Sequence, residues 1–410
     1  MISIEASAGT LLEELNSIRA ETDRLFRVLK SDALYDRPIS QRHRVLFYIG
    51  HLESFDSIQM CGEPLGLQSP DAALDTLFRA GIDPDSSHLP SDTPADWPSL
   101  DAIQRYVDLS RAHVDRHLEH VPVSAAQMAL EHRYMHAETL AYMFHNFEYD
   151  RKNINGAPPL AHSRGVTPAV KWCDIPGGEA VLGKRRDSGF GWDNEFEQVS
   201  RFVPAFRVQS NKVTNGEYLQ FVRQGAALPH FWKKRGDALF YRGMFQEVPL
   251  PLDWPVYVSL EEARAYAKWT GKDLLTEEQF HRAAYGTPAD QVRDYPWGST
   301  PPTHEHGNFN FKRWDPEPVT ATPKGSSAFG VNQLVGNGWE WTKTAFSPFP
   351  GFRPNESYPG YSADFLDGRH FVIKGGSPRT AAALLRSSFR NWFRPDYPYV
   401  YATFRCVENN

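Results

Sequence analysis

The sequence predicts a two-domain α+β protein, in which an N-terminal four-helix bundle precedes a mixed, loop-rich domain. The chain has 410 residues, which is more than one ordinary hydrophobic core can organise. Apolar residues recur at helical spacing through the first 150 residues. Beyond them, short β-branched and aromatic segments alternate with Gly and Pro turns, a pattern that is typical of strands joined by irregular loops.

Residues 1–155 are expected to form the bundle, because four amphipathic helices can bury their apolar faces against one another. A Pro-rich, acidic stretch over residues 86–94 is expected to be a long loop. The first expected helix begins at a capping box from Thr10 to Glu13, and the second spans residues 42–60. The third begins at an N-cap on Ser99. The fourth begins at an N-cap on Ser124 and runs to about Phe147.

Residues 165–410 are expected to form the second domain, after a linker rich in Asn, Gly and Pro at residues 153–159. Helices are expected at residues 215–222, at residues 260–269 and from residue 276 onward. Strands are expected at Ala180-Val-Leu-Gly183 and at Phe371-Val-Ile-Lys-Gly-Gly376.

Composition narrows the class of partner and the cellular address. The formal net charge of -6 argues against nucleic acid or an anionic membrane as the main partner. No apolar run reaches the roughly 18 residues that a membrane-spanning helix needs, and the first residues lack the pattern of a signal peptide. The three cysteines, Cys61, Cys173 and Cys406, imply no disulfide framework, so a reducing cytoplasm is the expected address. The oligomeric state stays open.

A histidine pattern in the fourth expected helix predicts a metal site. His132 and His136 are four residues apart, so their imidazoles share one helix face and can meet one ion. His51, which follows Gly50 in an otherwise apolar helix, fits as a third ligand. The alternative is a chance pair on an exposed face, and three neutral imidazoles suit iron and zinc equally. Glu138 is expected to support the ligands rather than to bind.

Several motifs resemble one enzyme family. Gly-His on the second expected helix and His-x-x-x-His-x-Glu on the fourth resemble the DinB-type domain of ergothioneine-type sulfoxide synthases. The second half resembles the formylglycine-generating-enzyme-like domain of the same enzymes, which has a C-type-lectin-like fold. The segments that carry this second resemblance are Lys212-Val-Thr-Asn-Gly-Glu-Tyr218, Pro255-Val-Tyr-Val-Ser-Leu-Glu-Glu-Ala263, Gly336-Asn-Gly-Trp-Glu-Trp-Thr342, Gly375-Gly-Ser377, Phe389-Arg-Asn-Trp392 and Phe404-Arg-Cys406.

The resemblance implies an O2-dependent non-heme iron enzyme that acts on hercynine, the trimethylated betaine of histidine. It implies that His51, His132 and His136 hold Fe(II). It also implies that Asn391 and Trp392 bind hercynine at the seam between the domains, because a Trp face attracts a quaternary ammonium group. A turn residue and a core aromatic are the alternative roles of these two residues.

The family uses an active-site tyrosine as a proton or electron donor in the O2 step. The resemblance points to Tyr358 and Tyr361, which lie in Tyr358-Pro-Gly-Tyr361-Ser. Ordinary aromatic contacts within a loop are the alternative role of each tyrosine.

The expected donor differs from that of the family members that use γ-glutamylcysteine. Those enzymes carry Asp and Arg where this chain has Phe393 and Tyr397, and a Gln where it has Met135. Aromatic surfaces suit an uncharged ring better than a charged dipeptide, so the sequence predicts a selenosugar donor, as in the selenoneine synthase branch. Cysteine or another thiol is the alternative. A second alternative is a charged clamp that has moved to Arg386, Arg390 or Arg394.

Three other functions are alternatives to an iron enzyme that acts on hercynine. Formylglycine generation needs a cysteine pair for copper late in the domain, where only Cys406 is available. A non-enzymatic lectin-like binding module leaves the three histidines unexplained. A zinc-dependent thiol transferase of the DinB type needs no second domain.

Overall fold

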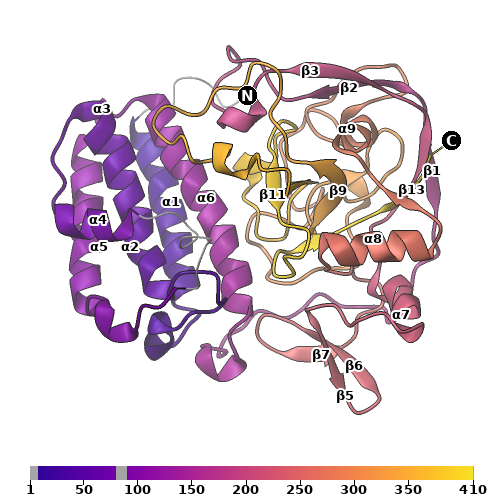
Figure 1. Ribbon diagram of the computed structural model, residues 1–410, viewed down its shortest axis with the longest axis horizontal. Coiled ribbons are helices and arrows are strands. Elements are labelled where there is room, and N and C mark those ends of the chain that lie inside the picture. The colour runs from indigo at the N-terminus through magenta and orange to yellow at the C-terminus, as the bar shows by residue number, and fades with distance from the viewer. Residues whose placement is uncertain (1–7, 80–89, 410) are drawn as a thin grey trace. The chain divides into compact units, whose positions relative to one another are not determined.

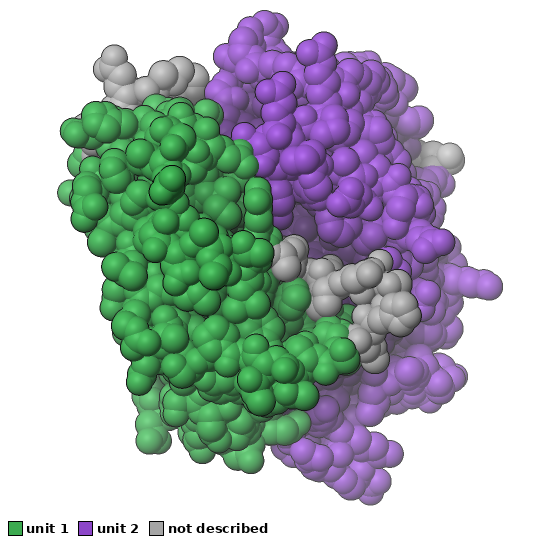
Figure 2. Space-filling model, turned by 60° about the vertical axis from the view of Figure 1, so that its left-hand side comes forward, with its two compact units in different colours: residues 1–157 green, residues 158–410 purple. Residues whose placement is uncertain are grey.

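The computed structural model describes residues 8–79 and 90–409. The chain divides into two compact units, residues 1–157 and 158–410, which Figure 2 colours separately. The first is helical and the second combines helices with sheets, so the expected α+β fold class is confirmed. Among the described residues, no helix is both long enough and apolar enough to cross a membrane.

Four long helices run alongside one another in the described part of unit 1 (Figure 1). Helix α1 (Ala8–Phe26) contacts α6 (Val123–His145), and α2 (Val45–Asp56) contacts both α5 (Leu100–His117) and α6. Helix α2 continues into a π-helical turn, Ser57–Gly62. The remaining short helices of this unit are α3 (Glu63–Leu65), α4 (Ala72–Phe78) and the 3₁₀ turns Ser31–Tyr35, Pro94–Asp96, Leu118–His120 and Tyr149–Arg151.

The four expected helices are confirmed, but three of their expected starts are wrong. The second helix begins at Val45 rather than at residue 42. Ser99 caps α5 and accepts a hydrogen bond from the backbone N–H of Ala102, as expected. Thr10 lies inside α1, because an exposed Thr on a polar helix face mimics a capping box. Ser124 also lies inside its helix, because Pro122, which needs no partner for an N–H, takes the N-cap position.

The sequence did not reveal helix α4, which lies between α2 and α5. Helix α4 is short, and Asp71 caps it by accepting a hydrogen bond from the backbone N–H of Leu74. The expected loop at residues 86–94 lies partly outside the described residues. Of its described part, residues 90–93 form neither helix nor strand.

The ring of Phe78, the last residue of α4, lies directly against the backbone of α2. A Cβ atom added to Gly50 would come within 2.3 Å of this ring, so only glycine fits there. Phe78 is fully buried, and its carbonyl oxygen accepts a hydrogen bond from the ring of His51, the next residue of α2. Gly50 therefore lets α4 pack closely against α2, and this packing brings the Phe78 carbonyl within hydrogen-bond distance of His51.

Unit 2 contains four small sheets within residues 158–409 (Figure 1). One has the strand order β1-β4-β13-β8 and is antiparallel, and another has the order β11-β10-β9-β12, with β12 parallel to β9. The strands are β1 (Trp172–Ile175), β2 (Gly178–Leu182), β3 (Val199–Val203), β4 (Phe206–Gln209), β5 (Trp232–Arg235), β6 (Ala238–Arg242), β7 (Glu247–Pro249), β8 (Asp273–Leu274), β9 (Trp339–Ala345), β10 (Phe371–Lys374), β11 (Asn391–Phe393), β12 (Ala402–Thr403) and β13 (Cys406–Asn409).

The helices of unit 2 form where the sequence predicts them, because each begins with a capping box. They are α7 (Asn215–Arg223), α8 (Leu260–Trp269) and α9 (Glu277–Tyr285). The boxes start at Thr214, Ser259 and Thr276. The expected strands at Ala180 and Phe371 are also confirmed, as β2 and β10. Further 3₁₀ turns lie at Asp193–Glu195, Pro323–Gly325, Ala363–Phe365 and Ala382–Leu384.

Edge strand β11 carries three of the residues that the sequence assigns to substrate. It pairs with β10 so that Trp392 lies opposite Val372 and Asn391 opposite Ile373. Because side chains alternate along a strand, Asn391 and Phe393 point to one face of the sheet and Trp392 to the other. The sequence-adjacent residues therefore face different surroundings.

We expect Gly50→Ala to lower the free energy of unfolding by about 1–3 kcal/mol, because the new methyl group overlaps the Phe78 ring. Gly62→Ala is the matched control. Gly62 belongs to the same continuous helical segment, and the nearest atom to its added Cβ is 3.8 Å away. Urea unfolding of both variants measures the difference. An equal effect at the two positions would contradict a steric role for Gly50.

Candidate functional site

Three histidine side chains converge in the interior of unit 1. His51 comes from α2, and His132 and His136 come from successive turns of α6. Each offers a ring nitrogen, and these nitrogens lie within 4.8 Å of one another. The three residues are 3%, 2% and 1% exposed, so solvent does not separate them. The structure thus brings together the three residues that the sequence assigns to metal.

The hydrogen bond of His51 fixes which of its nitrogens can bind a metal. Its Nδ1 lies 2.8 Å from the carbonyl oxygen of Phe78. A carbonyl only accepts, so Nδ1 carries the proton and donates, and Nε2 keeps its lone pair. This Nε2 is buried and has no hydrogen-bond partner among the described residues. An orphaned buried acceptor of this kind is suited to bind a metal ion.

Burial keeps all three imidazoles neutral. It lowers the pKa of His51 to about 4, against an ordinary value of 6.5. The pKa values of His132 and His136 are also lowered well below 6.5, first by burial and then by neighbouring imidazoles and the charge of Arg133. Metal ions bind neutral imidazole, so the site does not have to lose protons before it binds a metal near neutral pH.

The spacing within the cluster fits a single metal ion. The Nε2 atoms of His132 and His136 are 3.0 Å apart. Two nitrogens at about 2.1 Å from one ion, at right angles to each other, would be separated by roughly 3.0 Å. Right angles are typical of six-coordinate iron, in which three protein ligands leave open positions for reactants. The residues present therefore fit Fe(II), although the donor set also suits zinc.

Aromatic rings hold the imidazoles in place. Phe55 stacks on His132 with ring centroids 3.5 Å apart, and Phe47 stacks on His51 at 5.1 Å. Tyr48 lies 6.1 Å from His136. Sequence reasoning missed these contacts, although the spacing of Phe47, His51 and Phe55 by four residues was a readable signal of one helix face.

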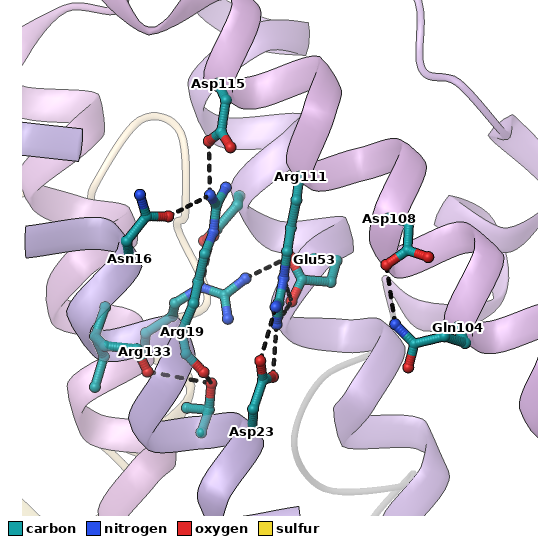
Figure 3. A network of polar contacts seen from close by, with 12 residues as sticks. Asn16, Arg19, Asp23, Glu53, Gln104, Asp108, Arg111, Asp115 and Arg133 are labelled. Carbon is teal, nitrogen blue, oxygen red and sulfur yellow. Dashed lines mark hydrogen bonds and ion pairs between the residues drawn. The ribbon is translucent and has the colours of Figure 1, made fainter. Parts of the chain in front are cut away.

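A buried ionic network joins the helices that carry the histidines (Figure 3). Arg133, which follows His132 on α6, is fully buried and pairs with Glu53 at 2.7 Å and Asp56 at 2.6 Å on α2. Glu53 also pairs with Arg111 of α5 at 2.9 Å, and Arg111 pairs with Asp23 of α1 at 2.7 Å. The network thus links all four long helices.

Charge is balanced unevenly within this network. Burial opposes ionisation of Glu53, but the guanidinium groups of Arg133 and Arg111 lower its pKa overall. Burial raises the pKa of Asp56 to about 6, because Arg133 and Arg19 do not offset the loss of water and Glu53 adds a negative charge. Glu53 is therefore the firmly ionised partner of Arg133.

Trp392 lies in an aromatic cluster of unit 2 together with one of the expected catalytic tyrosines. It stacks on Phe346 at 4.1 Å, and Tyr361 meets it edge to face at 5.6 Å. Tyr361 also stacks on Trp192 at 3.9 Å, and Tyr358 lies 5.9 Å from Tyr361. Burial raises the pKa of Tyr358, so its hydroxyl stays protonated near neutral pH. The structure thus brings Tyr358, Tyr361 and Trp392 into one cluster.

Asn391 is oriented by its own strand. Its Oδ1 accepts a hydrogen bond of 2.8 Å from the backbone N–H of Trp392. This contact fixes the amide, so that its NH₂ group is the end available to donate. Asn391 is half-buried, as Trp392 is.

Phe393 and Tyr397 form a stacked aromatic pair, with ring centroids 5.3 Å apart and an interplanar angle of 16°. Tyr399 extends the pair, meeting Tyr397 edge to face at 5.1 Å. All three residues are half-buried. Phe393 and Tyr397 therefore present aromatic surface at the two positions where the γ-glutamylcysteine-using enzymes carry Asp and Arg.

Two of the three arginines that could form a relocated clamp are already paired. Arg386 forms an ion pair with the buried Glu195 at 2.5 Å, and Arg390 pairs with the buried Glu277 at 2.9 Å. A guanidinium already matched to a buried carboxylate gains little by binding another. Arg394 is exposed.

Comparison with known proteins places the chain in a family. Residues 159–410 match the model of the sulfatase-modifying factor enzyme 1-like domain. Hercynine oxygenase of Mycobacterium tuberculosis is 35% identical over 68% of this chain and 69% of that protein. Hercynine oxygenase of Mycolicibacterium thermoresistibile is 32% identical over 83% of this chain and 81% of that protein.

A fungal relative matches more of this chain but is itself longer. Ergothioneine biosynthesis protein 1 of Neurospora crassa is 26% identical over 98% of this chain, which spans only 58% of that protein. The matches to these relatives agree with the resemblance that the histidine and Arg-Asn-Trp motifs carry. The chain belongs to the ergothioneine-type sulfoxide synthase family, and its residues 159–410 are a sulfatase-modifying factor enzyme 1-like domain.

Proposed function

We propose that this chain is an O2-dependent non-heme iron enzyme that joins a chalcogen donor to the imidazole carbon of hercynine. The convergence of three buried, neutral imidazoles from α2 and α6 carries the proposal. The names of the relatives, hercynine oxygenase and ergothioneine biosynthesis protein 1, support the substrate and the use of oxygen. This chain spans little more than half of the fungal relative. The proposed activity therefore rests on the three-histidine cluster rather than on the activity of that longer protein.

His51, His132 and His136 would hold Fe(II). When bound, the iron would supply the reduction of O2 that an oxidative bond-forming reaction requires. Three neutral ligands leave the full charge of the ion to attract an anionic thiolate or selenolate. The Phe47 and Phe55 rings keep water from the imidazoles and hold them in a fixed orientation.

Asn391 and Trp392 are the proposed hercynine-binding residues, and because they point to opposite faces of edge strand β11, hercynine would reach both across this edge. The cluster of Trp392 and Tyr361 presents electron-rich rings to a trimethylammonium group, which cannot donate hydrogen bonds and is bound best by aromatic faces. The Asn391 amide, with its oxygen already engaged, has an NH₂ group that suits the betaine carboxylate. The half-burial of both residues leaves part of their surface for a ligand.

Tyr361 and Tyr358 are the proposed proton or electron donors. Tyr361 is the stronger candidate of the two, because it contacts the proposed substrate residue Trp392. Tyr358 lies beside Tyr361. The raised pKa of Tyr358 suits a reserve proton source behind it.

The donor that we propose is an uncharged chalcogen sugar, with a selenosugar as the expected form. The stacked pair of Phe393 and Tyr397 supports this choice, since an aromatic surface binds a sugar ring but leaves a buried carboxylate unpaired. The pairing of Arg386 and Arg390 with glutamates also weakens the case for a relocated clamp. A thiol such as cysteine is the alternative, and the naming of the relatives after ergothioneine favours it.

Replacing His51, His132 or His136 by Ala should lower iron affinity more than about 100-fold, because loss of a ligand exceeds the cost of losing its supporting contacts. Elemental analysis of protein reconstituted anaerobically with Fe(II) measures the loss. His120→Ala is the matched control, since this histidine has a side chain that is 66% exposed. Full iron content in His51→Ala would remove that residue from the ligand set, and activity with zinc alone would overturn the choice of iron.

Trp392→Ala and Tyr361→Phe should separate binding from chemistry. Loss of a cation–π contact of about 0.5–2 kcal/mol predicts roughly 3- to 30-fold weaker hercynine binding in Trp392→Ala. Tyr361→Phe should retain binding, because its ring remains, but slow the single-turnover reaction with O2. Calorimetry and rapid mixing are the two measurements. Trp269→Ala, on an exposed face of α8, is the control. Unchanged affinity in Trp392→Ala would exclude it from the hercynine site.

A donor competition tests the aromatic pair. Iron-loaded protein with hercynine and O2 receives equal amounts of a selenosugar, cysteine and γ-glutamylcysteine, and mass spectrometry identifies the products. We expect the sugar adduct to dominate. The double variant Phe393→Asp, Tyr397→Arg should shift the products toward γ-glutamylcysteine, because it restores partners for a charged donor. A wild-type preference for γ-glutamylcysteine would refute an uncharged donor, and a preference for cysteine would establish the alternative.

A further inference from the structure

Unit 1 holds another group of metal-ligating side chains, away from the three-histidine cluster. Cys61 lies on the π-helical turn that extends α2, and His113 and His117 lie one turn apart on α5. The Cys61 sulfur and one ring nitrogen of each histidine lie within 4.8 Å of one another. Cys61 is fully buried and the two histidines are half-buried.

Both histidines have a nitrogen suited to a metal. Nδ1 of His117 lies 2.8 Å from the carbonyl oxygen of His113, so it donates its proton there and Nε2 keeps a lone pair. Nε2 of His113 is buried without a hydrogen-bond partner among the described residues. A buried ring nitrogen without a partner is costly, and a metal ion would satisfy it. The two rings lie 4.9 Å apart and nearly at right angles.

We propose that Cys61, His113 and His117 form a second metal site, which contains sulfur and takes Zn²⁺. A thiolate with two imidazoles is a donor set that zinc favours, with water as the fourth ligand. Ligand atoms around tetrahedral zinc are roughly 3.5 Å apart, so small side-chain rotations bring these three atoms into place. The all-nitrogen cluster at His51, by contrast, contains no sulfur.

The Cys61 thiol has the carboxylate of Asp56 as a charged neighbour. His113 has charged neighbours of both signs, the guanidinium of Arg116 and the carboxylate of Asp75. Zinc binding replaces the thiol proton with a metal–sulfur bond and releases that proton to solvent, so affinity rises with pH. In the metal-free state the thiol stays protonated, since burial raises its pKa to about 11.

The site would tie α5 to the helical segment that carries His51. Cys61 follows His51 by ten residues along α2 and its π-helical continuation, and that turn contacts α5. Extra-residue turns of this kind are frequent at functional sites. Zinc would act there as a crosslink between helices, and its binding does not depend on the proposed hercynine chemistry.

Cobalt tests the proposal, because Co²⁺ replaces zinc and a cobalt–thiolate bond gives an intense near-ultraviolet charge-transfer band. We expect the metal-free full-length protein, titrated anaerobically with Co²⁺, to develop this band and to lose it when Zn²⁺ is added. Cys61→Ser and the half-buried His117→Gln should each abolish the band. Cys173→Ser, which removes another thiol, is the matched control and should retain it.

The variant His132→Ala separates the two sites. It should keep the band while losing metal from the three-histidine cluster, so failure of the iron site does not imitate failure of this one. Absence of the band in wild-type protein would overturn the proposal. So would a band that survives both Cys61→Ser and His117→Gln, because the sulfur would then belong to another cysteine.

Discussion

The architecture of unit 1 depends on the burial of one cation, Arg133. Its guanidinium is removed from water and is compensated by Glu53 and Asp56, so α6 and α2 have to meet in the register that places these groups together. Breaking a buried pair of this kind costs about 3–5 kcal/mol, because it leaves an uncompensated charge. The same register brings His51 to His132 and His136. The ion pairs of Arg133 and the convergence of the three histidines are therefore consequences of one helix pairing.

Burial is the main cause of the lowered pKa values of the three histidines, and the network adds to it. A positive charge beside a buried imidazole disfavours a second positive charge, and Arg133 contributes to the lowered pKa of all three rings. Their lone pairs are then available to a metal ion, while Phe47 and Phe55 limit their motion. On these two helices, carboxylates compensate the charge of Arg133, while separate aromatic residues hold the imidazoles in place.

Unit 2 also pairs its buried carboxylates with arginines. The buried carboxylates of Glu195 and Glu277 are matched by Arg386 and Arg390, which leaves aromatic rings to define the surroundings of β11. Rings recognise ligands through faces and edges, so their specificity rests on orientation rather than on charge. Trp392, stacked on Phe346 and met edge to face by Tyr361, is held by contacts from the connection between β9 and β10.

The sequence by itself determined the features that depend on neighbouring residues. The helical period places His132 and His136 on one face, and Ser or Thr three residues before Glu or Gln starts α7, α8 and α9. Only the tertiary structure decided that His51 meets that face, that Phe78 selects its tautomer, and that Cys61 lies beside His113. These partners are separated by tens of residues in the sequence. They meet only because their helices pack together, and a local sequence pattern does not show which helices pack.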